Sequence, residues 1–182
     1  MCETKDYPIG TKITGIITET HDTKTFILDK AIDAKPGQFV MVWIPGIDEK
    51  PFTITEKAKH LAITVKKKGK ATQAMHNMKK GDILGIRGPY GDGTFDLTKK
   101  KRIILVGGGC GTLGLKLLLE EATKKGITVD AIIGADTKKN LLFTGKFNKL
   151  GARVTITTDD GSAGKKGFVT TALEEKLKTQ KY

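Results

Sequence analysis

The sequence lacks the residues on which several classes of protein depend. Its 182 residues include two cysteines, Cys2 and Cys110, which are too few for a disulfide framework, a four-cysteine zinc site or a self-contained iron–sulfur cluster. No apolar run approaches the roughly 18 residues that a membrane-spanning helix needs, and the first ten residues contain no apolar signal-peptide core. We therefore expect a soluble, cytoplasmic protein that does not enter a membrane.

Aromatic residues are also scarce, at 6% of the chain, and this affects how the charge is interpreted. The formal net charge is +12, and most of it lies in residues 99–182, where 17 Lys and Arg face 8 Asp and Glu. Proteins that bind single-stranded nucleic acids combine basic residues with aromatic stacking platforms, which are missing here. The charge therefore indicates a solvated lysine surface or an acidic partner protein, and not a nucleic acid.

The first half of the chain is typical of a small antiparallel β-barrel. Six short segments rich in Val, Ile, Thr and Phe are separated by turns that contain Pro and Gly. These predicted strands cover 12–18, 25–29, 38–44, 52–55, 61–66 and 82–87. Their number and spacing predict a six-stranded Greek-key barrel, with one short helix at about 72–78.

The second half has a different pattern, in which strands alternate with helices. A continuous apolar run at 102–106 is typical of a strand buried on both faces of a parallel sheet, and a helix follows at 112–124. Two further strand–helix pairs are predicted at 129–134 with 140–150, and at 154–158 with 169–178. This alternation predicts a doubly wound α/β domain with three strands in the order 3-2-1. We place the boundary between a barrel domain, 1–98, and an α/β domain, 99–182, at the lysine triplet.

The turn after the first α/β strand has the composition of a phosphate-binding loop. It consists of Gly107, Gly108, Gly109, Cys110, Gly111 and Thr112. Glycines let a pyrophosphate approach the backbone, and the free amides and dipole of a helix N-terminus favour its negative charge. The spacing differs from G-x-G-x-x-G because Leu113 stands in the place of the third glycine. Cys110 is either a reactive thiol or a small residue that lines the site.

Five motifs occur in the order typical of one flavoprotein family. They are KPFTI at 50–54, GKAT at 69–72, GPYG at 88–91, GGGCG at 107–111 and TDDGS at 158–162. In this order they resemble the signatures of the ferredoxin reductase-like flavoproteins. Within that superfamily, the sequence most resembles the electron-transfer subunits of NAD-dependent dihydroorotate dehydrogenases. The resemblance covers about residues 8–178, and it implies an FAD-binding barrel followed by an NAD-binding α/β domain.

The resemblance also implies which residues of the barrel hold FAD. They are Lys50, Pro51, Phe52, Thr53, Thr64, Val65, Lys66, Ala71 and Thr72. The 50–53 segment would bring a cation near the phosphates or ring and line the isoalloxazine edge, and the 64–66 segment would back the flavin and ribityl chain. The helix that starts at 71–72 would meet the pyrophosphate with its amides and a hydroxyl. The family usually has Arg where Lys50 stands, so a bidentate phosphate contact is replaced by a point charge.

A nicotinamide nucleotide is implied at the ends of the α/β strands. The implied residues are the turn 107–112, Asp136, Asp159, Asp160 and Gly161. Asp136 follows the second strand, where it would accept a ribose hydroxyl and repel a 2′-phosphate, so we expect NADH to be preferred to NADPH. Lys138 and Lys139 favour the opposite preference. Asp159 and Asp160 fit turn-forming residues that line the groove better than a catalytic carboxylate pair.

Two segments typical of the resembling subunits are not found in this sequence. One is a strand that ends in Cys-Gly-Pro, and the other carries four cysteines for a [2Fe–2S] cluster, whose ligands are therefore absent here. We expect an α/β domain that is incomplete at its C-terminal end, with strand 102–106 at an open edge. No metal site is expected, because His21, His60 and His76 share no metal-binding spacing.

The function implied by the resemblance is electron transfer between NAD(H) and a partner redox protein by way of FAD. The expected partner is the catalytic subunit of a dihydroorotate dehydrogenase, an enzyme of pyrimidine biosynthesis, or a ferredoxin-like protein, in a hetero-oligomer. No individual catalytic residue is predicted, since such chemistry belongs to the cofactors. The alternatives are a free-standing NAD(P)H:flavin or ferredoxin reductase, and a non-catalytic nucleotide-binding module.

Overall fold

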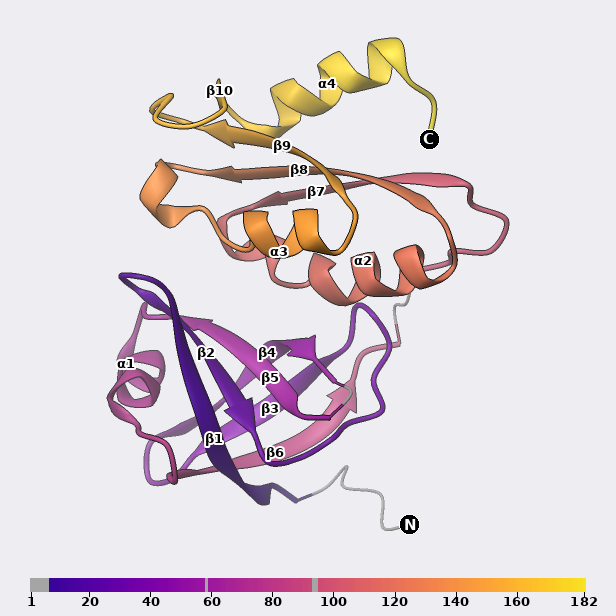
Figure 1. Cartoon of the computed structure of the whole chain (residues 1–182). Coiled ribbons are helices and arrows are strands. Elements are labelled where there is room, and N and C mark those ends of the chain that lie inside the picture. Colours follow the sequence, from indigo (N-terminus) through magenta and orange to yellow (C-terminus); the bar gives the residue numbers. More distant parts are fainter. Residues whose placement is uncertain (1–6, 58, 93–94) are drawn as a thin grey trace. The chain divides into compact units, whose positions relative to one another are not determined.

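The computed structural model describes residues 7–57, 59–92 and 95–182 (Figure 1). The chain divides into two compact units, 1–94 and 95–182. The first contains a closed six-stranded antiparallel barrel, and the second a four-stranded sheet with helices. The predicted fold class is confirmed. Cys2 lies outside the described residues, and within them no helix is long and apolar enough to cross a membrane.

The barrel strands follow one another around the wall in the order β1-β2-β5-β4-β3-β6. Their bounds are β1 Ile9–Thr20, β2 Thr23–Leu28, β3 Phe39–Ile44, β4 Asp48–Glu56, β5 Leu61–Lys66 and β6 Ile83–Tyr90, and the helix α1 spans Lys70–Asn77. Strand β4 begins four residues earlier than the sequence predicted. The reason is a tight hairpin, in which Ile44 of β3 pairs with Asp48 of β4 across a three-residue turn.

The buried residues of the barrel include a cluster of threonine hydroxyls. Thr25, Thr55 and Thr64 are all buried. Thr64 Oγ1 lies 2.8 Å from Thr25 Oγ1 and 3.3 Å from Thr55 Oγ1, and Thr55 donates to the Ala62 carbonyl at 3.1 Å. Because buried hydroxyls are costly when they lack partners, this mutual bonding lets β-branched threonines occupy core positions.

The second unit is a parallel sheet in the order β10-β9-β8-β7. Its elements are β7 Arg102–Gly108, the 3₁₀ helix η1 Gly109–Thr112, α2 Leu115–Lys124, β8 Thr128–Ala135, the 3₁₀ helix η2 Lys138–Asn140, α3 Thr144–Lys149, β9 Arg153–Thr158, β10 Lys165–Lys166 and α4 Val169–Thr179. The predicted order 3-2-1 of the long strands is confirmed. The sequence did not predict β10, because two lysines carry no strand pattern.

Three details of the predicted α/β unit are wrong. The helix expected at 112–124 is divided into η1 and α2, and the one expected at 140–150 is reduced to α3 after the separate turn η2. Strand β7 was expected to be buried on both faces, yet of residues 102–106 only Leu105 is buried. Within the described residues β7 pairs with β8 alone, so it is an edge strand that solvent reaches.

The α/β unit has a helix layer on each face of its sheet (Figure 1). Helices α2 and α3 cover one face, where their side chains and those of the sheet form one core. This core includes Leu105, Leu118, Leu119, Ala122, Val129, Ala131, Ile133 and Phe147. Helix α4 lies on the other face and contacts β7, β8 and β9. Since successive strand residues point to opposite faces, Asp130, Ile132 and Gly134 of β8 face α4.

Candidate functional site

The first candidate site is a cavity of about 370 Å³ on the barrel, where β4 meets the start of α1. Two segments far apart in the sequence line it. From β4 come Asp48, Lys50, Pro51 and Phe52, and from the β5–α1 connection and the first turn of α1 come residues 68–72. Lys50, Pro51, Phe52, Ala71 and Thr72 were all predicted from sequence to serve one ligand, and the fold brings these five together.

The first turn of α1 is arranged to receive an anion. The Thr72 hydroxyl accepts the N–H groups of Lys68, at 2.8 Å, and Gly69, at 3.0 Å, and it donates to the Gly69 carbonyl at 3.0 Å. These bonds use the hydroxyl fully, so it does not meet a phosphate in this arrangement. The amides of residues 70–72 belong to the first turn, whose N–H groups have no acceptor within the helix. No acidic side chain lies in that turn.

Lys50 supplies a positive charge to the same cavity, but it forms an ion pair with Asp48. Its Nζ lies 2.7 Å from Asp48 Oδ2, and both side chains are exposed. The hydrogen bond from Lys50 holds the pKa of the Asp48 carboxyl below its ordinary value. A bound phosphate would therefore meet Lys50 in competition with Asp48, a partner that the sequence analysis did not foresee.

The barrel wall opens between β4 and β5 beside this cavity. Their pairing includes Glu56 with Ala62 and Ile54 with Ile63, and in the described residues it does not continue toward Lys50. From Thr53 to Lys50, β4 pairs only with β3. The edge of β5 beyond Ile63 is thereby released from the β4 ladder, and His76 of α1 takes up one of its main-chain acceptors, the Val65 carbonyl, at 2.8 Å.

The side chains of the three predicted residues of β5 are engaged within the barrel unit, and His76 Nε2 lies 2.8 Å from the Val65 carbonyl oxygen. Thr64 and Val65 are buried in the barrel, and Lys66 Nζ lies 3.3 Å from Asp22 Oδ2. Burial opposes ionisation of Asp22, but hydrogen bonds from Thr20, Thr23 and Lys66 outweigh it and hold its pKa below the ordinary value. Lys66 is thus committed to an ion pair on the β2 side of the strand.

The second candidate site lies at the carboxyl ends of β7, β8 and β9, where ligands bind in open α/β sheets. The glycine turn follows β7. A Cβ atom on Gly107 would lie 2.8 Å from the Thr112 Cα, so only glycine permits the turn to close. Thr112 is buried and donates to the Gly107 carbonyl at 3.1 Å. Gly109 adopts φ +51°, a left-handed conformation that favours glycine.

The segment after this turn differs from a direct strand-to-helix junction. Residues 109–112 form η1, and α2 begins three residues later, at Leu115. Cys110 is exposed on η1 as a free thiol. Its exposure fits both interpretations of this residue, as a reactive thiol and as a small lining residue.

Asp136 occupies the carboxyl end of β8 and is held in a fixed orientation. Its Oδ1 accepts the N–H of Thr137 at 2.8 Å, and the Asn140 side-chain amide donates to Oδ1 at 2.8 Å and to Oδ2 at 3.0 Å. The carboxylate itself is exposed. Sequence reasoning missed Asn140, although an amide four residues after an acidic residue across a short turn is a possible signal for such a clasp.

The turn after β9 is bonded to the turn after β8, which makes one continuous rim. The N–H groups of Asp159 and Asp160 donate to the carbonyls of Ala135, at 3.1 Å, and Asp136, at 3.2 Å. Asp160 Oδ1 accepts the Ser162 hydroxyl, and this bond lowers the pKa of Asp160. Gly161 closes the turn at φ +81°. The prediction that these residues form a turn is confirmed.

Helix α4 begins at the same rim, with an aromatic residue that the sequence analysis missed. Phe168 directly precedes the helix and is 66% exposed. Its neighbour Val169 packs on β8, where a Cβ atom on Gly134 would overlap Val169 Cγ1 and lie 2.7 Å from Thr157 Oγ1. Gly134 therefore lets α4 approach the sheet, and this approach places the Phe168 ring at the rim.

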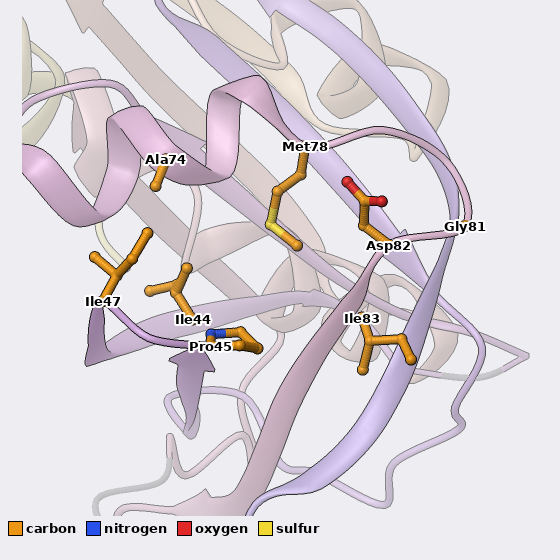
Figure 2. A pocket seen from close by; sticks show the side chains of 8 residues that line it. All are labelled: Ile44, Pro45, Ile47, Ala74, Met78, Gly81, Asp82 and Ile83. Atoms are coloured by element: carbon orange, nitrogen blue, oxygen red, sulfur yellow. The ribbon is translucent and has the colours of Figure 1, made fainter.

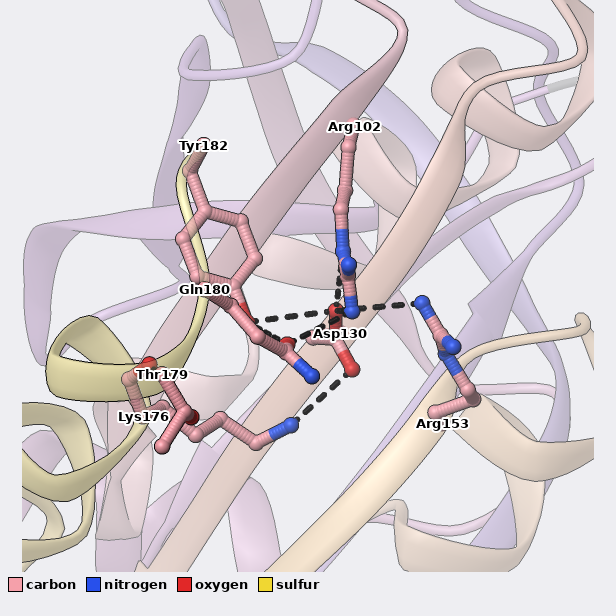
Figure 3. A network of polar contacts seen from close by, with 7 residues as sticks. All are labelled: Arg102, Asp130, Arg153, Lys176, Thr179, Gln180 and Tyr182. Carbon is pink, nitrogen blue, oxygen red and sulfur yellow. Dashed lines mark hydrogen bonds and ion pairs between the residues drawn. The ribbon is translucent and has the colours of Figure 1, made fainter.

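The opposite end of the unit carries a buried ionic cluster (Figure 3). Asp130, 1% exposed at the start of β8, accepts Arg102 Nε at 2.9 Å, Lys176 Nζ at 2.9 Å, Arg153 at 3.3 Å and the Tyr182 hydroxyl at 3.2 Å. Burial opposes its ionisation, but the bonds from Lys176 and Arg102 outweigh it and lower its pKa. The cluster ties α4 to three strands, far along β8 from the rim.

Comparisons with known proteins identify relatives of this chain. A family model described as the oxidoreductase FAD-binding domain matches residues 11–95. A probable dihydroorotate dehydrogenase B (NAD(+)) electron transfer subunit from Methanocaldococcus jannaschii is 44% identical over 175 residues, which cover 96% of this chain and 66% of the relative. A protein of the same description from Archaeoglobus fulgidus is 39% identical, and the match covers 92% of this chain and 68% of that protein.

Solved structures share the fold over nearly the whole chain. The NADH-dependent reduced ferredoxin-NADP oxidoreductase, solved in a study of flavin-based electron bifurcation, superposes with a TM-score of 0.85 at 28% identity and covers 94% of this chain and 64% of the other. Phthalate dioxygenase reductase has the same fold at 17% identity, with a TM-score of 0.74 over 86% of this chain and 53% of the other.

These comparisons establish the family, and they also show a difference in length. The chain spans 66% of the relative from Methanocaldococcus jannaschii and 63% of another from Methanocella arvoryzae, slightly less than two thirds. No group of three or more His, Cys, Asp or Glu in the described part of the chain could hold a metal ion. The chain belongs to the ferredoxin reductase-like FAD-binding oxidoreductases, together with the dihydroorotate dehydrogenase B electron transfer subunits.

Proposed function

We propose that this chain carries electrons between NAD(H) and a partner redox protein by way of FAD, as the electron-transfer part of a dihydroorotate dehydrogenase. The observation that carries the proposal is the convergence of β4 and the α1 N-terminus on one cavity beside the opening in the barrel wall. When bound, FAD accepts a hydride from NADH and passes electrons on singly or in pairs. The chain supplies position and electrostatics.

In this proposal the barrel unit, at its expected extent of 1–98, holds FAD. The amides of residues 70–72 at the start of α1 would bind the pyrophosphate, with the charge of Lys50 beside them. The β4 segment 51–53 would bond the flavin through its main chain, and residues 64–66 of β5, whose Val65 carbonyl already contacts His76, would back it. The donor set fits the group, because it offers amides and a cation with no acidic residue in the helix turn.

The α/β unit would hold the nicotinamide nucleotide at its rim. The glycine turn 107–112 admits a pyrophosphate, because Gly107 and Gly109 have no side chain to block it. Asp136, oriented by Asn140, would accept a ribose hydroxyl, and residues 159–161 would line the groove. The exposed Phe168 ring offers a flat apolar face to a nucleotide ring. The preference proposed is for NADH over NADPH.

The partner would be the catalytic subunit of the dehydrogenase, in a hetero-oligomer. The relatives are described as electron transfer subunits, a description that implies a second subunit. The net charge of +12 favours an acidic surface on that partner. A [2Fe–2S] cluster in the electron path would need ligands other than Cys2 and Cys110, since two thiols cannot hold one.

The test is spectroscopic. Purified protein should be yellow or take up added FAD, and NADH should bleach the bound flavin under anaerobic conditions. Lys50→Ala should weaken FAD binding by about tenfold, the size of a lost charge-assisted contact. Lys12→Ala, which removes an exposed lysine from β1, is the matched control and should leave the affinity unchanged. A colourless protein that takes up no FAD would refute the proposal.

A further inference from the structure

Positive charge in the α/β unit gathers at one end of its sheet. Because the helices run back along the strands, β7, β8 and β9 begin where α2, α3 and α4 finish (Figure 1). This basic end consists of four segments, 96–102, 121–130, 149–153 and 176–182. They contain 11 of the 17 Lys and Arg of residues 99–182, and only three Asp and Glu. The rim at the opposite end, formed by 107–112, 135–140 and 158–169, is nearly balanced, with four Lys and three Asp.

Helix dipoles explain only part of this excess. The negative end of a helix dipole favours a lysine in the last turn, which accounts for Lys124 of α2 and Lys178 of α4. The exposed lysines 99–101 instead precede a strand, and β-sheets have only small net dipoles. Their charges therefore call for another counterion.

Asp130 joins the four segments of the basic end, but it does not neutralise them (Figure 3). Arg102, Arg153 and Lys176, one from each of the other segments, all contact its carboxylate. Its Oδ2 accepts three donors and its Oδ1 accepts Lys176, so the carboxylate is largely used. One carboxylate thus faces three cations, and the fold holds these cations in place.

Arg153 is the cation of this cluster that another molecule can reach most easily. Its side chain is 58% exposed, against 28% for Arg102 and 23% for Lys176. Its ion pair with Asp130, at 3.3 Å, is also longer than those of Arg102, at 2.7 Å, and Lys176, at 2.9 Å. A guanidinium carries five N–H donors in a fork that matches a carboxylate. Arg153 therefore has donors to offer a carboxylate from another molecule.

The remaining features of the basic end suit a protein better than a nucleic acid. Single-stranded nucleic acids stack their bases on aromatic rings. The only aromatic residue of the four segments is Tyr182, whose ring is already taken by Arg102, with Cζ 5.2 Å from the ring centre. Leu177, 53% exposed in the last turn of α4, adds an apolar side chain between two lysines. Protein interfaces combine apolar contacts with arginine in this way.

We propose that the basic end of the α/β unit docks an acidic surface of a partner protein, with Arg153 in direct contact and lysines 99–101 steering the approach. Charge complementarity selects this occupant, since the same excess repels a second copy of this face. The inference rests on the proposed function only for the existence of a partner. It goes beyond that function by placing the partner at the end of the sheet away from the nucleotide rim.

The experiment uses a fluorescein-labelled decaglutamate peptide as the probe of an acidic surface. Fluorescence anisotropy measures its Kd at about 50 mM salt, where exposed charges are weakly screened. Lys100→Glu/Lys101→Glu reverses two exposed lysines of the basic end and should raise the Kd by about tenfold. Arg153→Gln removes one charge and should raise it by about threefold. Far-UV circular dichroism checks that each variant stays folded.

The matched control lies on the barrel, beside an apolar groove of about 500 Å³ at the C-terminal end of α1 (Figure 2). Lys79 and Lys80 directly follow Met78, which lines this groove, and both are exposed. Lys79→Glu/Lys80→Glu changes the net charge of the chain by the same amount as the variant of the basic end. It should raise the Kd of the peptide by less than about twofold, because these lysines have no part in the proposed contact.

Three results would overturn the inference. The unaltered protein does not bind the peptide, or the two double variants weaken it equally, which would mean that the peptide senses only net charge. In the third, an oligo-dT of the same charge binds more tightly than the peptide and is lost in Lys100→Glu/Lys101→Glu, so that the basic end serves a nucleic acid. FAD uptake should be the same in all these variants. Protein that takes up no FAD but keeps the expected peptide pattern would refute only the proposed function.

Discussion

The two ends of strand β8 each carry an aspartate, and their surroundings are opposite. Asp130, near the amino end, is buried and bonded to two arginines, a lysine and a tyrosine. Asp136, just beyond the carboxyl end, is exposed and bonded to a side-chain amide and a backbone N–H. Asp130 has its charge neutralised within the fold. Asp136 is exposed to solvent at the rim.

This difference follows from the construction of a parallel sheet. At one end of β8, helix α4 closes over the strand and Lys176 reaches Asp130, so a charge there must be paired. At the other end the strands lead into loops, which can hold a charge in solvent. The comparison teaches that an aspartate within the strand is paired inside the fold, whereas one just after the strand is exposed, where the proposed function needs a ligand contact. Three substitutions test this division.

The largest effect is expected at the buried end. Asp130→Asn removes the carboxylate that pairs with Arg102 and Lys176 and leaves these cations without that partner, which should lower the free energy of unfolding by about 3 kcal/mol. Urea unfolding followed by far-UV circular dichroism measures the change. Trp43 fluorescence follows the barrel separately and should shift less.

The control for Asp130 is an exposed ion pair on α2. Glu121→Gln breaks the pair with Lys125, whose side chains are 36% and 52% exposed. It should cost about 0.5 kcal/mol at most, because solvent screens such pairs. If the two variants lose the same free energy of unfolding, burial does not make the Asp130 cluster more stabilising than an exposed ion pair.

A smaller effect, on binding, is expected at the exposed end. Asp136→Ser removes the proposed acceptor of a ribose hydroxyl, so the affinity for NADH should fall by about tenfold. Affinity for NADPH should rise, because a 2′-phosphate would no longer meet a carboxylate and Lys138 and Lys139 lie close in sequence. Titration of both nucleotides measures the ratio. Tighter binding of NADPH than NADH by the unaltered protein would show that the lysines prevail.

The smallest effect is expected at Asn140, which positions Asp136 and is not proposed to touch the nucleotide. Asn140→Ala keeps the carboxylate but removes its clasp at 2.8 and 3.0 Å, so NADH affinity should fall by about threefold. Combining it with Asp136→Ser should add little further loss, since the clasp has nothing left to orient. Additive losses in the double variant would mean that Asn140 acts independently of Asp136.

Much of the fold could be predicted from the sequence, because its signals are local. Strand–turn spacing predicted all six barrel strands, and strand–helix alternation predicted the α/β unit and the order of its long strands. Strand ends were less accurate, as at β4, whose first residues are polar or proline and show no apolar alternation. Their strand conformation comes from pairing with β3, a contact that neighbouring residues do not encode.

For the candidate sites, the sequence predicted which residues take part but not the ion pairs and hydrogen bonds that they form. It predicted Lys50 and Asp136 as binding residues. It did not predict that Asp48 forms an ion pair with Lys50 or that Asn140 donates a hydrogen bond to Asp136. It marked Thr72 as a phosphate ligand, whereas the hydroxyl is used within its own loop. It gave no sign of the apolar groove along α1, because the lining side chains come from three segments and resemble core residues when taken singly.

The sequence by itself determined the family, the two-unit organisation and the glycine turn. The order of motifs, the periodicity of apolar residues and the backbone conformations open to glycine can all be read from neighbouring residues. The tertiary structure decided which of these charges is buried and which is exposed. Asp130 and Asp136 are the same residue type six positions apart, one within β8 and the other just after it. Their difference arises because Asp130 lies within β8, beneath Lys176 of α4, whereas Asp136 lies in the turn after the strand, and burial sets the cost of an unpaired charge.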